Sequence, residues 1–553
     1  MTDTRRALLW GVFSVSLVML WDGWNKHNGH PSMFSPPVAA SAVAGASAPG
    51  VPSAAVAAQP AGVAPVPGSV AAAAPSQKIE ITTDLVRATI DTRGASLVGL
   101  SLPRYHDEHD ASKPVVLFDQ SAERVYQADS GLIPKLAGQA ALPNHTTPMT
   151  LVPGPLTLAD GQGELAVSFE SPDQGGVKLR KTYVFKRGDY AIRVRHEVVN
   201  TSAAPVAPQL YLQLSRDGTV KSTSMFMGPS SFTGPAVYTD AAKFQKLDFA
   251  KIESGKAEYE KAADSGWVAM VQHHFVGAWV FNDKLARSFQ AKKEATNLYS
   301  VAMTLPLDTV APGTSKTVET TLYAGPQEEK KLEALAPGLE LVKDYGWVTM
   351  LAKPLFWLLD KLHGLLGNWG WSIVALVVLL KIAFYWLNAS AYRSMGKMKA
   401  VNPRIQELRE RLKDDPQKMQ QEMMRIYREE KVNPLGGCLP IFIQMPFFIA
   451  LYSVLLASVE MRGAPWIGWI HDLSVQDPYY ILPALMTATT LFQTWLNPTP
   501  PDPTQAKMMW IMPLMFSVMF LFFPAGLVLY WFVNNLLSIA QQWLINRQLG
   551  LNR

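Results

Sequence analysis

One lysine lies near the middle of a long apolar run that carries no other charge. Lys381 falls within residues 369–392, a stretch long enough to cross a bilayer, for which a helix needs about 20 apolar residues. An ammonium group at that depth costs about 3 kcal/mol or more. Asp and Glu are absent from the other long apolar runs, so Lys381 needs water, backbone carbonyls or neutral polar side chains. The candidates are Gln444, Gln493, Asn534, Asn535, Ser538 and Gln541.

We interpret this arrangement as a water-filled cavity within the membrane. Snorkelling of Lys381 to an interface is disfavoured, because a central position lies too far from either surface. Structural hydration inside a helical bundle is the interpretation that stays open. In the preferred interpretation, the positive charge attracts acidic or polar groups of a partner that enters the cavity.

Residues 392–432 follow this run and form a second candidate site. Apolar residues at three- and four-residue spacing predict two helices, and Asp414-Asp415-Pro416 predicts the break and the N-cap between them. A charged connector and a docking arm are both compatible with this pattern. We favour the arm, because a short loop is enough to join two spans and methionines suit adaptable surfaces. The residues assigned to it are Arg404, Arg409, Arg411, Met419, Met423 and Tyr427.

Motifs for catalysis or for bound metals are missing from the sequence. It contains no phosphate-binding loop, no cluster of metal ligands and no acyl-transfer motif, and the pair His273-His274 is expected to pack or to face solvent. The single cysteine, Cys438, excludes an internal disulfide framework and multi-cysteine zinc or iron–sulfur sites. We therefore predict that the protein is not an enzyme and uses neither metal nor cofactor.

The composition indicates an integral membrane protein with more than one domain. The chain has 553 residues, of which 48% are hydrophobic and 17% are charged. Soluble proteins average roughly 25% charged residues. The deficit is concentrated in the long apolar runs near the C-terminus, which excludes a fully soluble, fibrous or wholly disordered protein.

The elements that position these candidates are predicted from local patterns. Residues 78–325 alternate apolar and polar positions between turn signals, which predicts a large antiparallel β-sandwich. Residues 339–368 have an apolar stripe at helical spacing and are expected to lie on the membrane surface, bent near Pro354; a helix capping the soluble domain explains the first half equally well. The remaining predicted segments are an N-terminal anchor (1–25), an Ala/Pro-rich linker (26–77), a five-span core (369–545) and a tail (546–553).

The charge of the loops predicts the orientation of six spans in total. We place the five core spans at about 369–391, 436–459, 479–497, 508–523 and 525–545. The segment between the first two is rich in Lys and Arg, so the positive-inside rule makes it cytoplasmic, together with both termini. The β-sandwich is then periplasmic in a Gram-negative cell. An uncleaved N-terminal anchor agrees with this orientation, because it places Arg5 and Arg6 in the cytoplasm. Cleavage of a signal peptide between Ala40 and Ala48 is the alternative.

Several motifs resemble those of the YidC family of membrane protein insertases, which is related to the mitochondrial oxidase-assembly and chloroplast Albino proteins. The resemblance covers residues 340–545, and the layout as a whole is similar to the Gram-negative form. The motifs are Lys431-Val-Asn-Pro-Leu-Gly-Gly-Cys-Leu-Pro440, Ile443-Gln-Met-Pro446, Trp469-Ile-His-Asp-Leu-Ser474, Asp477-Pro-Tyr-Tyr-Ile-Leu-Pro483 and Phe523-Pro-Ala-Gly-Leu-Val-Leu-Tyr530.

This resemblance implies a hydrophilic groove that is open to the cytoplasm and the lipid and closed toward the periplasm. Lys381 occupies the place where the family usually has arginine, so the charge is kept while the planar fork of the guanidinium is lost. The implied partners are nascent membrane proteins, the lipid bilayer, the Sec translocon and the ribosome, with no specific nucleic-acid sequence. The residues assigned to the groove are Lys381, Gln444, Gln493, Tyr530, Trp531, Asn534 and Ser538.

We therefore expect an insertase of the bacterial inner membrane that works without hydrolysing ATP, alone or with the Sec translocon. A small-molecule or ion transporter that uses Lys381 as an anion site is the first alternative; missing intramembrane carboxylates and missing repeats argue against it. A periplasmic chaperone or scaffold, anchored by its spans, is the second alternative.

Overall fold

The computed structural model describes residues 76–107, 110, 112–135, 139–219, 232–412, 415–430, 439–497 and 503–548. The predicted N-terminal anchor, nearly all of the linker, Cys438 and most of the C-terminal tail lie outside the described residues. The chain separates into two compact units, one ending at Val342 and the other beginning at Lys343. We name them the β domain and the helical unit, and describe each by itself.

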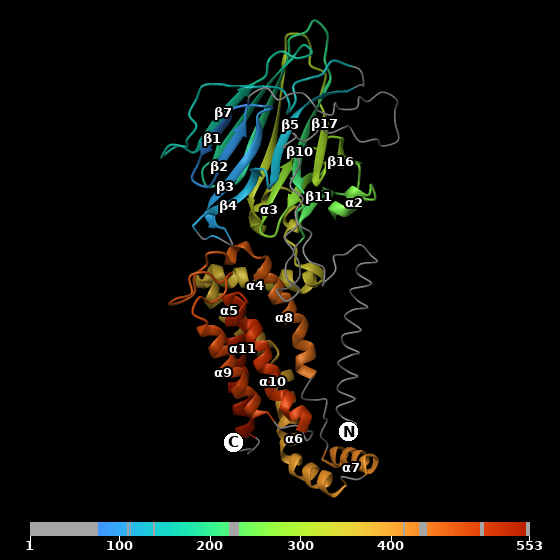
Figure 1. Cartoon of the computed structure of the whole chain (residues 1–553), viewed down its shortest axis with the longest axis vertical. Helices are drawn as coiled ribbons and strands as arrows, with labels where there is room; N and C mark the ends of the chain where they lie inside the picture. Colours follow the sequence, from blue (N-terminus) through green and yellow to red (C-terminus); the bar gives the residue numbers. More distant parts are fainter. Residues whose placement is uncertain are drawn as a thin grey trace. The chain divides into compact units, whose positions relative to one another are not determined.

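The β domain consists of two antiparallel sheets that face each other (Figure 1). The first has the order β1 (Lys78–Thr82), β2 (Arg87–Asp91), β3 (Ser96–His106), β4 (Pro114–Gln120), β5 (Val125–Pro134), β10 (Pro208–Asp217), β17 (Leu298–Pro306), β16 (Arg287–Ala295) and β13 (Ala262–Ala263). The second has the order β12 (Lys243–Lys246), β11 (Gly234–Thr239), β14 (Trp267–Val271), β15 (Phe275–Val280), β18 (Ser315–Pro326), β9 (Ala191–Asn200), β8 (Val177–Lys186), β7 (Glu164–Glu170) and β6 (Thr150–Leu151). Short helices α2 (Phe249–Glu253), α3 (Glu329–Leu335) and η2 (Leu339–Val342) complete it.

Strand β9 explains why the alternation in the sequence led to the correct fold. Ile192, Val194 and Val198 are buried between the sheets, whereas Arg195 points outward and pairs with Glu319 of the neighbouring β18 at 3.1 Å. Successive side chains of a strand point to opposite faces, so this period of two gives one buried and one solvated face. The predicted antiparallel β-sandwich is confirmed.

A polar cluster lies between the two sheets. Lys181 of β8 is fully buried, and its Nζ donates to the carbonyl oxygens of Gly94 and Ser130, both at 2.5 Å. The Ser130 hydroxyl also contacts Nε2 of buried His196 at 2.9 Å. Burial lowers the pKa of Lys181 to about 7 and the pKa of His196 to about 3, because a desolvated cation is costly. The cluster links β8 and β9 of one sheet to β5 of the other.

The helical unit contains every candidate residue for the groove and for the arm. Its elements are η3 (Gly346–Val348), α4 (Thr349–Leu366), α5 (Trp369–Ala383), α6 (Tyr385–Arg411), α7 (Pro416–Glu429), α8 (Leu439–Ala457), η4 (Val459–Met461), α9 (Ile481–Leu496), α10 (Pro503–Phe520) and α11 (Ala525–Gln548). The apolar core of the unit is built by α4, α5, α8 and α11, where Ala352, Leu359, Leu376, Val454 and Val528 are fully buried.

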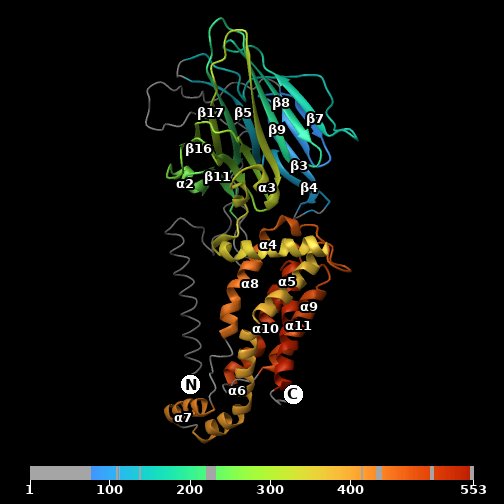
Figure 2. The ribbon, with the colours of Figure 1, turned by 180° about the vertical axis from the view of Figure 1, so that it is seen from behind.

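Helix α4 lies across the ends of α5 and α8 (Figures 1 and 2). It buries Leu355 and Phe356 in the core, while Met350 and Trp357 on the other side are 81% and 61% exposed. Pro354 lies in its second turn without ending the helix. The predicted stretch 339–368 is thus divided into η2, η3 and one amphipathic helix.

The first predicted span differs from one continuous helix over residues 369–391. The helix breaks at Phe384, and α5 meets the first part of α6 at an angle of 68°. In the described residues, no single helix is long and apolar enough to cross a membrane, whereas this bent pair meets the same length and hydropathy criteria when taken together. Shorter apolar helices are Gln444–Ala457, Ile481–Leu496 and Ala506–Phe520.

Candidate functional site

Two adjoining hollows lie among α5, α6, α8, α9 and α11. They enclose about 420 and 990 Å³ of space, which includes their open mouths. The smaller hollow has apolar walls from α5 and α8, and the larger one extends between α9 and α11. Both are lined by Lys381, Asn388, Gln444, Tyr530 and Asn534.

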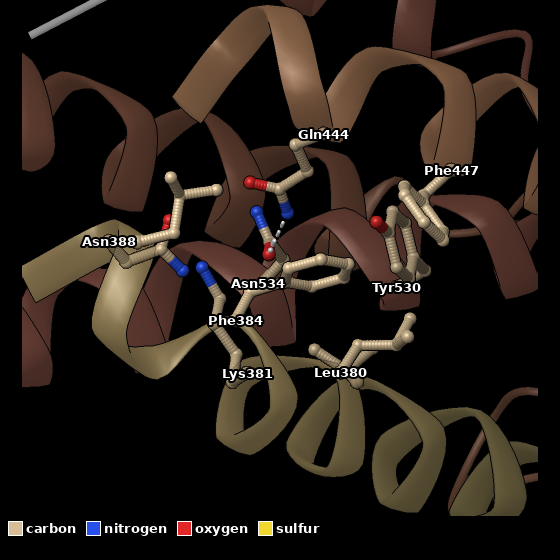
Figure 3. Close-up of a pocket in the computed structure, with 10 residues that line it drawn as sticks. Leu380, Lys381, Phe384, Asn388, Gln444, Phe447, Tyr530 and Asn534 are labelled. Atoms are coloured by element: carbon tan, nitrogen blue, oxygen red, sulfur yellow. Dashed lines mark hydrogen bonds between the residues drawn. The ribbon is translucent and has the colours of Figure 1, made fainter. Parts of the chain in front are cut away.

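Lys381 reaches into these hollows from the last turn of α5. Its Nζ donates to the hydroxyl oxygen of Ser538 at 2.7 Å, and the Ser538 hydroxyl donates to the carbonyl oxygen of Asn534 at 2.7 Å. The bond to the preceding turn of α11 therefore orients the hydroxyl so that its lone pairs face the ammonium group. Figure 3 shows Lys381 and Asn388 extending from the two sides of the helix break into the same space.

The opposite wall is a pair of side-chain amides. Gln444 of α8 donates through Nε2 to Oδ1 of Asn534 at 3.0 Å, which joins α8 to α11 across the hollow (Figure 3). Phe384 and Phe447 meet edge to face at 5.0 Å between their ring centroids and form an apolar part of the wall of the smaller hollow. Polar and apolar side chains thus line the same space, which suits a substrate segment that carries both polar and apolar residues.

The structure brings together the seven residues assigned to the groove, with different roles. Lys381, Gln444, Tyr530 and Asn534 line both hollows, whereas Gln493, Trp531 and Ser538 line the larger one. Of the two other neutral candidates, Asn535 also lines the larger hollow, whereas Gln541 is not among the lining residues of either. Asn535 donates to Thr490 Oγ1 at 2.8 Å, and Gln541 donates to the carbonyl oxygen of Tyr385 beside the helix break at 3.3 Å.

The sequence reasoning missed Asn388 and Tyr392. Asn388 is buried and lines both hollows, and Tyr392 lines the larger one. Their signal was present, because residues 381, 388, 392 and 395 recur at helical spacing and share one face of the apolar run. The break at Phe384 had no such signal, since neither proline nor glycine accompanies it.

Lys381 is the only formally charged residue among those that line the two hollows in the described part of the chain. The described residues that line the hollows include no carboxylate, and the described part of the chain holds no group of three or more potential metal ligands. The lysine has three N–H donors, of which Ser538 accepts one. Such a site can attract and hold a polar or acidic segment.

The arm is a closed helical hairpin. Val401 and Ile405 of α6 pack against Tyr427 of α7, with Met398, Met423 and Ile426 around them. Met423 and Tyr427 therefore belong to the interior of the hairpin, while Met419 is half-buried. Arg404 forms an ion pair with Glu430 of the following helix end, and Arg411 is exposed.

Comparisons with known proteins cover nearly the whole chain. Residues 78–358 match the family model described as YidC periplasmic domain, and residues 361–551 match the 60Kd inner membrane protein model. A relative from Cupriavidus necator named "Membrane protein insertase YidC" is 57% identical over 99% of this chain and 98% of its own length. A relative of the same name from Ralstonia nicotianae is 57% identical over 100% of this chain and 99% of its own length.

Two solved structures show weaker similarity. A crystal structure of an active YidC insertase is 18% identical, covers 84% of this chain and 92% of its own, and has a TM-score of 0.40. A putative aldose 1-epimerase from Escherichia coli K12 is 9% identical, covers 45% of this chain and 99% of its own, and has a TM-score of 0.28.

Proposed function

Because the chain belongs to the YidC family of membrane protein insertases, we propose that it inserts nascent inner-membrane proteins by receiving their polar segments in the hollows around Lys381. The family is located in the inner membrane and has a periplasmic domain, which here is the β domain. The observation that carries the proposal is a single half-buried charge, Lys381, in hollows that are lined by both polar and apolar side chains of the described chain.

The free energy for insertion comes from the substrate. An apolar segment of about 20 residues gains by partitioning into lipid, while the polar segment beside it resists crossing. Amides from Gln444, Asn388 and Asn534 and the ammonium group of Lys381 offer that polar segment hydrogen-bonding partners inside the bilayer. The cost of the crossing falls, so neither a nucleotide nor a bound cofactor is required in this proposal. That the protein is no enzyme stays a prediction.

The proposal includes a topology. We propose six spans, with the first predicted at residues 1–25, the core at 369–545 and both termini in the cytoplasm. The bent pair of α5 and α6 serves as the first core span, and α8, α9, α10 and α11 supply the others. Basic residues on the arm support this orientation through the positive-inside rule.

We further propose that the arm meets the substrate before the groove does, at the ribosome, at anionic lipid or beside the Sec translocon. Exposed Arg411 supplies positive charge, Arg404 is paired with Glu430, and the packed hairpin holds both helices in place. Deleting residues 399–431 with a short linker should impair insertion while the spans still fold. Wild-type insertion together with wild-type ribosome association would make the arm a connector only.

The central test uses proteoliposomes that contain only this protein. A small two-span substrate with an acidic tail should insert, and Lys381→Met should slow that substrate more than a version with a neutral tail, because methionine keeps the stem without the charge. In a Cys438→Ser background, single cysteines at Gln444, Asn534 and Ser538 should react with impermeant thiol reagents from the cytoplasmic side. Full activity of Lys381→Met without labelling from either side contradicts the proposal.

A transporter with an anion site at Lys381 is the second candidate, since that residue is the one charge lining the hollows in the described chain. The same vesicles separate the two functions. Uptake of a small anion that depends on Lys381, without substrate insertion, would favour transport.

A further inference from the structure

A buried lysine of the helical unit, Lys343, lies outside the hollows. The side chain of Lys343 is fully buried, and its Nζ lies 3.2 and 3.1 Å from the two carboxylate oxygens of Glu460. On another side, the ammonium group lies 3.6 Å from the ring centroid of Phe356. A carboxylate and an aromatic face thus enclose the charge, a geometry in which both ion pairing and cation–π attraction act in a dry setting.

The two partners belong to different parts of the helical unit. Lys343 precedes η3 and α4, whereas Glu460 lies in η4 at the start of the connection from α8 to α9, residues 458–480. Phe356 belongs to α4 itself. The ion pair therefore fastens this connection to the segment that carries α4.

The same connection also contacts the first turns of α5 and α11. Asn368 at the start of α5 donates through Nδ2 to the carbonyl oxygen of Pro465 at 3.1 Å. The amide of Gly526 in α11 donates to the carbonyl oxygen of Leu473 at 2.9 Å. Residues 458–480 thus cover one end of the helical unit, which we name the α4 end.

Below this cover, the way from the α4 end to the hollows is filled by apolar side chains. Ile373, Leu376, Val454 and Leu527 are at most 1% exposed, and they lie between the connection and the turn that carries Lys381. Loosening the connection would expose this packing, because residues 458–480 are the segment that covers it at the α4 end. The ion pair is well placed to resist that loosening.

We propose that Lys343 is a positioning residue for insertion: its pair with Glu460 keeps the α4 end sealed while a polar segment occupies the hollows. The proposal rests on the proposed function, and it adds a part of the molecule that does not contact the substrate. It also assigns an unequal role to the two partners. The side chain of Lys343 is 0% exposed, whereas that of Glu460 is 18% exposed.

This inequality predicts an order among variants. Glu460→Gln removes the carboxylate that lies 3.1 Å from a buried ammonium group, so it should loosen the α4 end most. Lys343→Met leaves a carboxylate that can reach water, so its effect should be smaller. The double variant should be less disturbed than Glu460→Gln alone, because the buried charge has been removed.

The experiment uses the full chain with Cys438→Ser and a reporter cysteine at Ser372, a fully buried position in the first turns of α5. An impermeant thiol reagent is added from the periplasmic side, and insertion and thermal unfolding are measured on the same preparations. Glu460→Gln should raise the labelling rate at least about tenfold and slow insertion, with the double variant in between. Lys361→Met, an exposed lysine of α4, is the matched control and should match the parent.

Wild-type labelling and insertion in Glu460→Gln would overturn the inference, and so would a lowered unfolding temperature with neither of them changed. If the parent protein itself fails to insert any substrate, the proposed function fails. The labelling order of the variants still reports on the seal in that case, so the two failures are distinguishable.

Discussion

Lys181 of the β domain is fully buried, whereas Lys381 of the helical unit is half-buried, and their surroundings differ accordingly. Lys181 is fully buried and donates to two carbonyl oxygens, 2.5 Å away, of residues packed around it. Lys381 donates to one hydroxyl group and borders two hollows. A lysine whose donors are used inside the fold holds that fold together. A lysine with donors left over beside open space is available to a ligand.

The largest expected effect on the insertion rate follows from reversing the charge at Lys381. Lys381→Glu should slow insertion of a substrate with an acidic tail at least about tenfold, because like charges now meet inside the bilayer. Lys381→Arg should stay within about threefold of the parent, since the charge is kept. Both are measured as insertion rates into proteoliposomes at equal protein content. Equal rates for the two variants would remove the charge from the mechanism.

The fully buried Lys181 should instead control how the free energy of unfolding of the β domain depends on pH. Its folded pKa of about 7 lies below the ordinary value of 10.5, so the unfolded chain binds the extra proton between these values. The contribution of Lys181 to the free energy of unfolding should therefore be full above pH 10.5, decline as the pH falls to about 7 and then level off, a loss of the order of 5 kcal/mol. His196, lowered from 6.5 to about 3, extends the decline to lower pH.

Thermal unfolding of residues 76–342 across this pH range measures the effect. Lys181→Met should flatten the curve above pH 7, while Lys178→Met, exposed on the same strand, should leave it unchanged. An unaltered slope in Lys181→Met would show that this lysine is not the group that titrates. Neither variant, in the full chain, should change the insertion rate.

A smaller effect is expected where packing leaves no room for a methyl group. A Cβ on Gly370 would lie 2.2 Å from Cδ1 of the Trp466 ring, so Gly370→Ala should cost about 1–3 kcal/mol of stability of the helical unit. Gly364→Ala in α4 meets nothing within 4 Å and should be neutral or stabilising by up to about 1 kcal/mol. Thermal unfolding in detergent compares them. Equal melting temperatures would mean that Trp466 moves freely.

The smallest effect on insertion should come from the largest change. Removing residues 80–320 while retaining the stretch 339–368 should leave insertion in a depletion strain intact, because the hollows are built entirely by the helical unit. Growth of the depleted cells is the measurement. Loss of growth at normal protein levels would favour a chaperone or scaffold role for the β domain.

Periodicity predicted the regular parts of the fold. Alternation in strands such as β9 reports directly which face is buried, so the sandwich followed from the sequence. Lys181 could not be predicted as a buried residue in this way. It shares one face of β8 with Val177, Leu179 and Tyr183. The carbonyl oxygens that accept its hydrogen bonds are brought to it only by the tertiary structure.

The candidate site was predictable through its one costly charge. A lysine in an apolar run needs polar neighbours, and the candidates were the neutral polar residues of the other long apolar runs. Which neighbour makes the bond was not predictable, because it depends on how α5 and α11 are rotated against each other. The break at Phe384 and the inward position of Tyr427 likewise depend on tertiary packing rather than on local sequence.

Helix α6 has a mechanical consequence. It runs from Tyr385 to Arg411 with Pro403 inside it, so the wall that carries Asn388 and the start of the arm, which carries Val401, form one rod of about 27 Å ahead of the proline. A tilt of this rod by about 5° around Phe384 would swing its far tip by about 2 Å but shift Asn388 by only about 0.5 Å. A thermal swing of the far tip therefore reaches the residues that line the hollows only as a much smaller displacement.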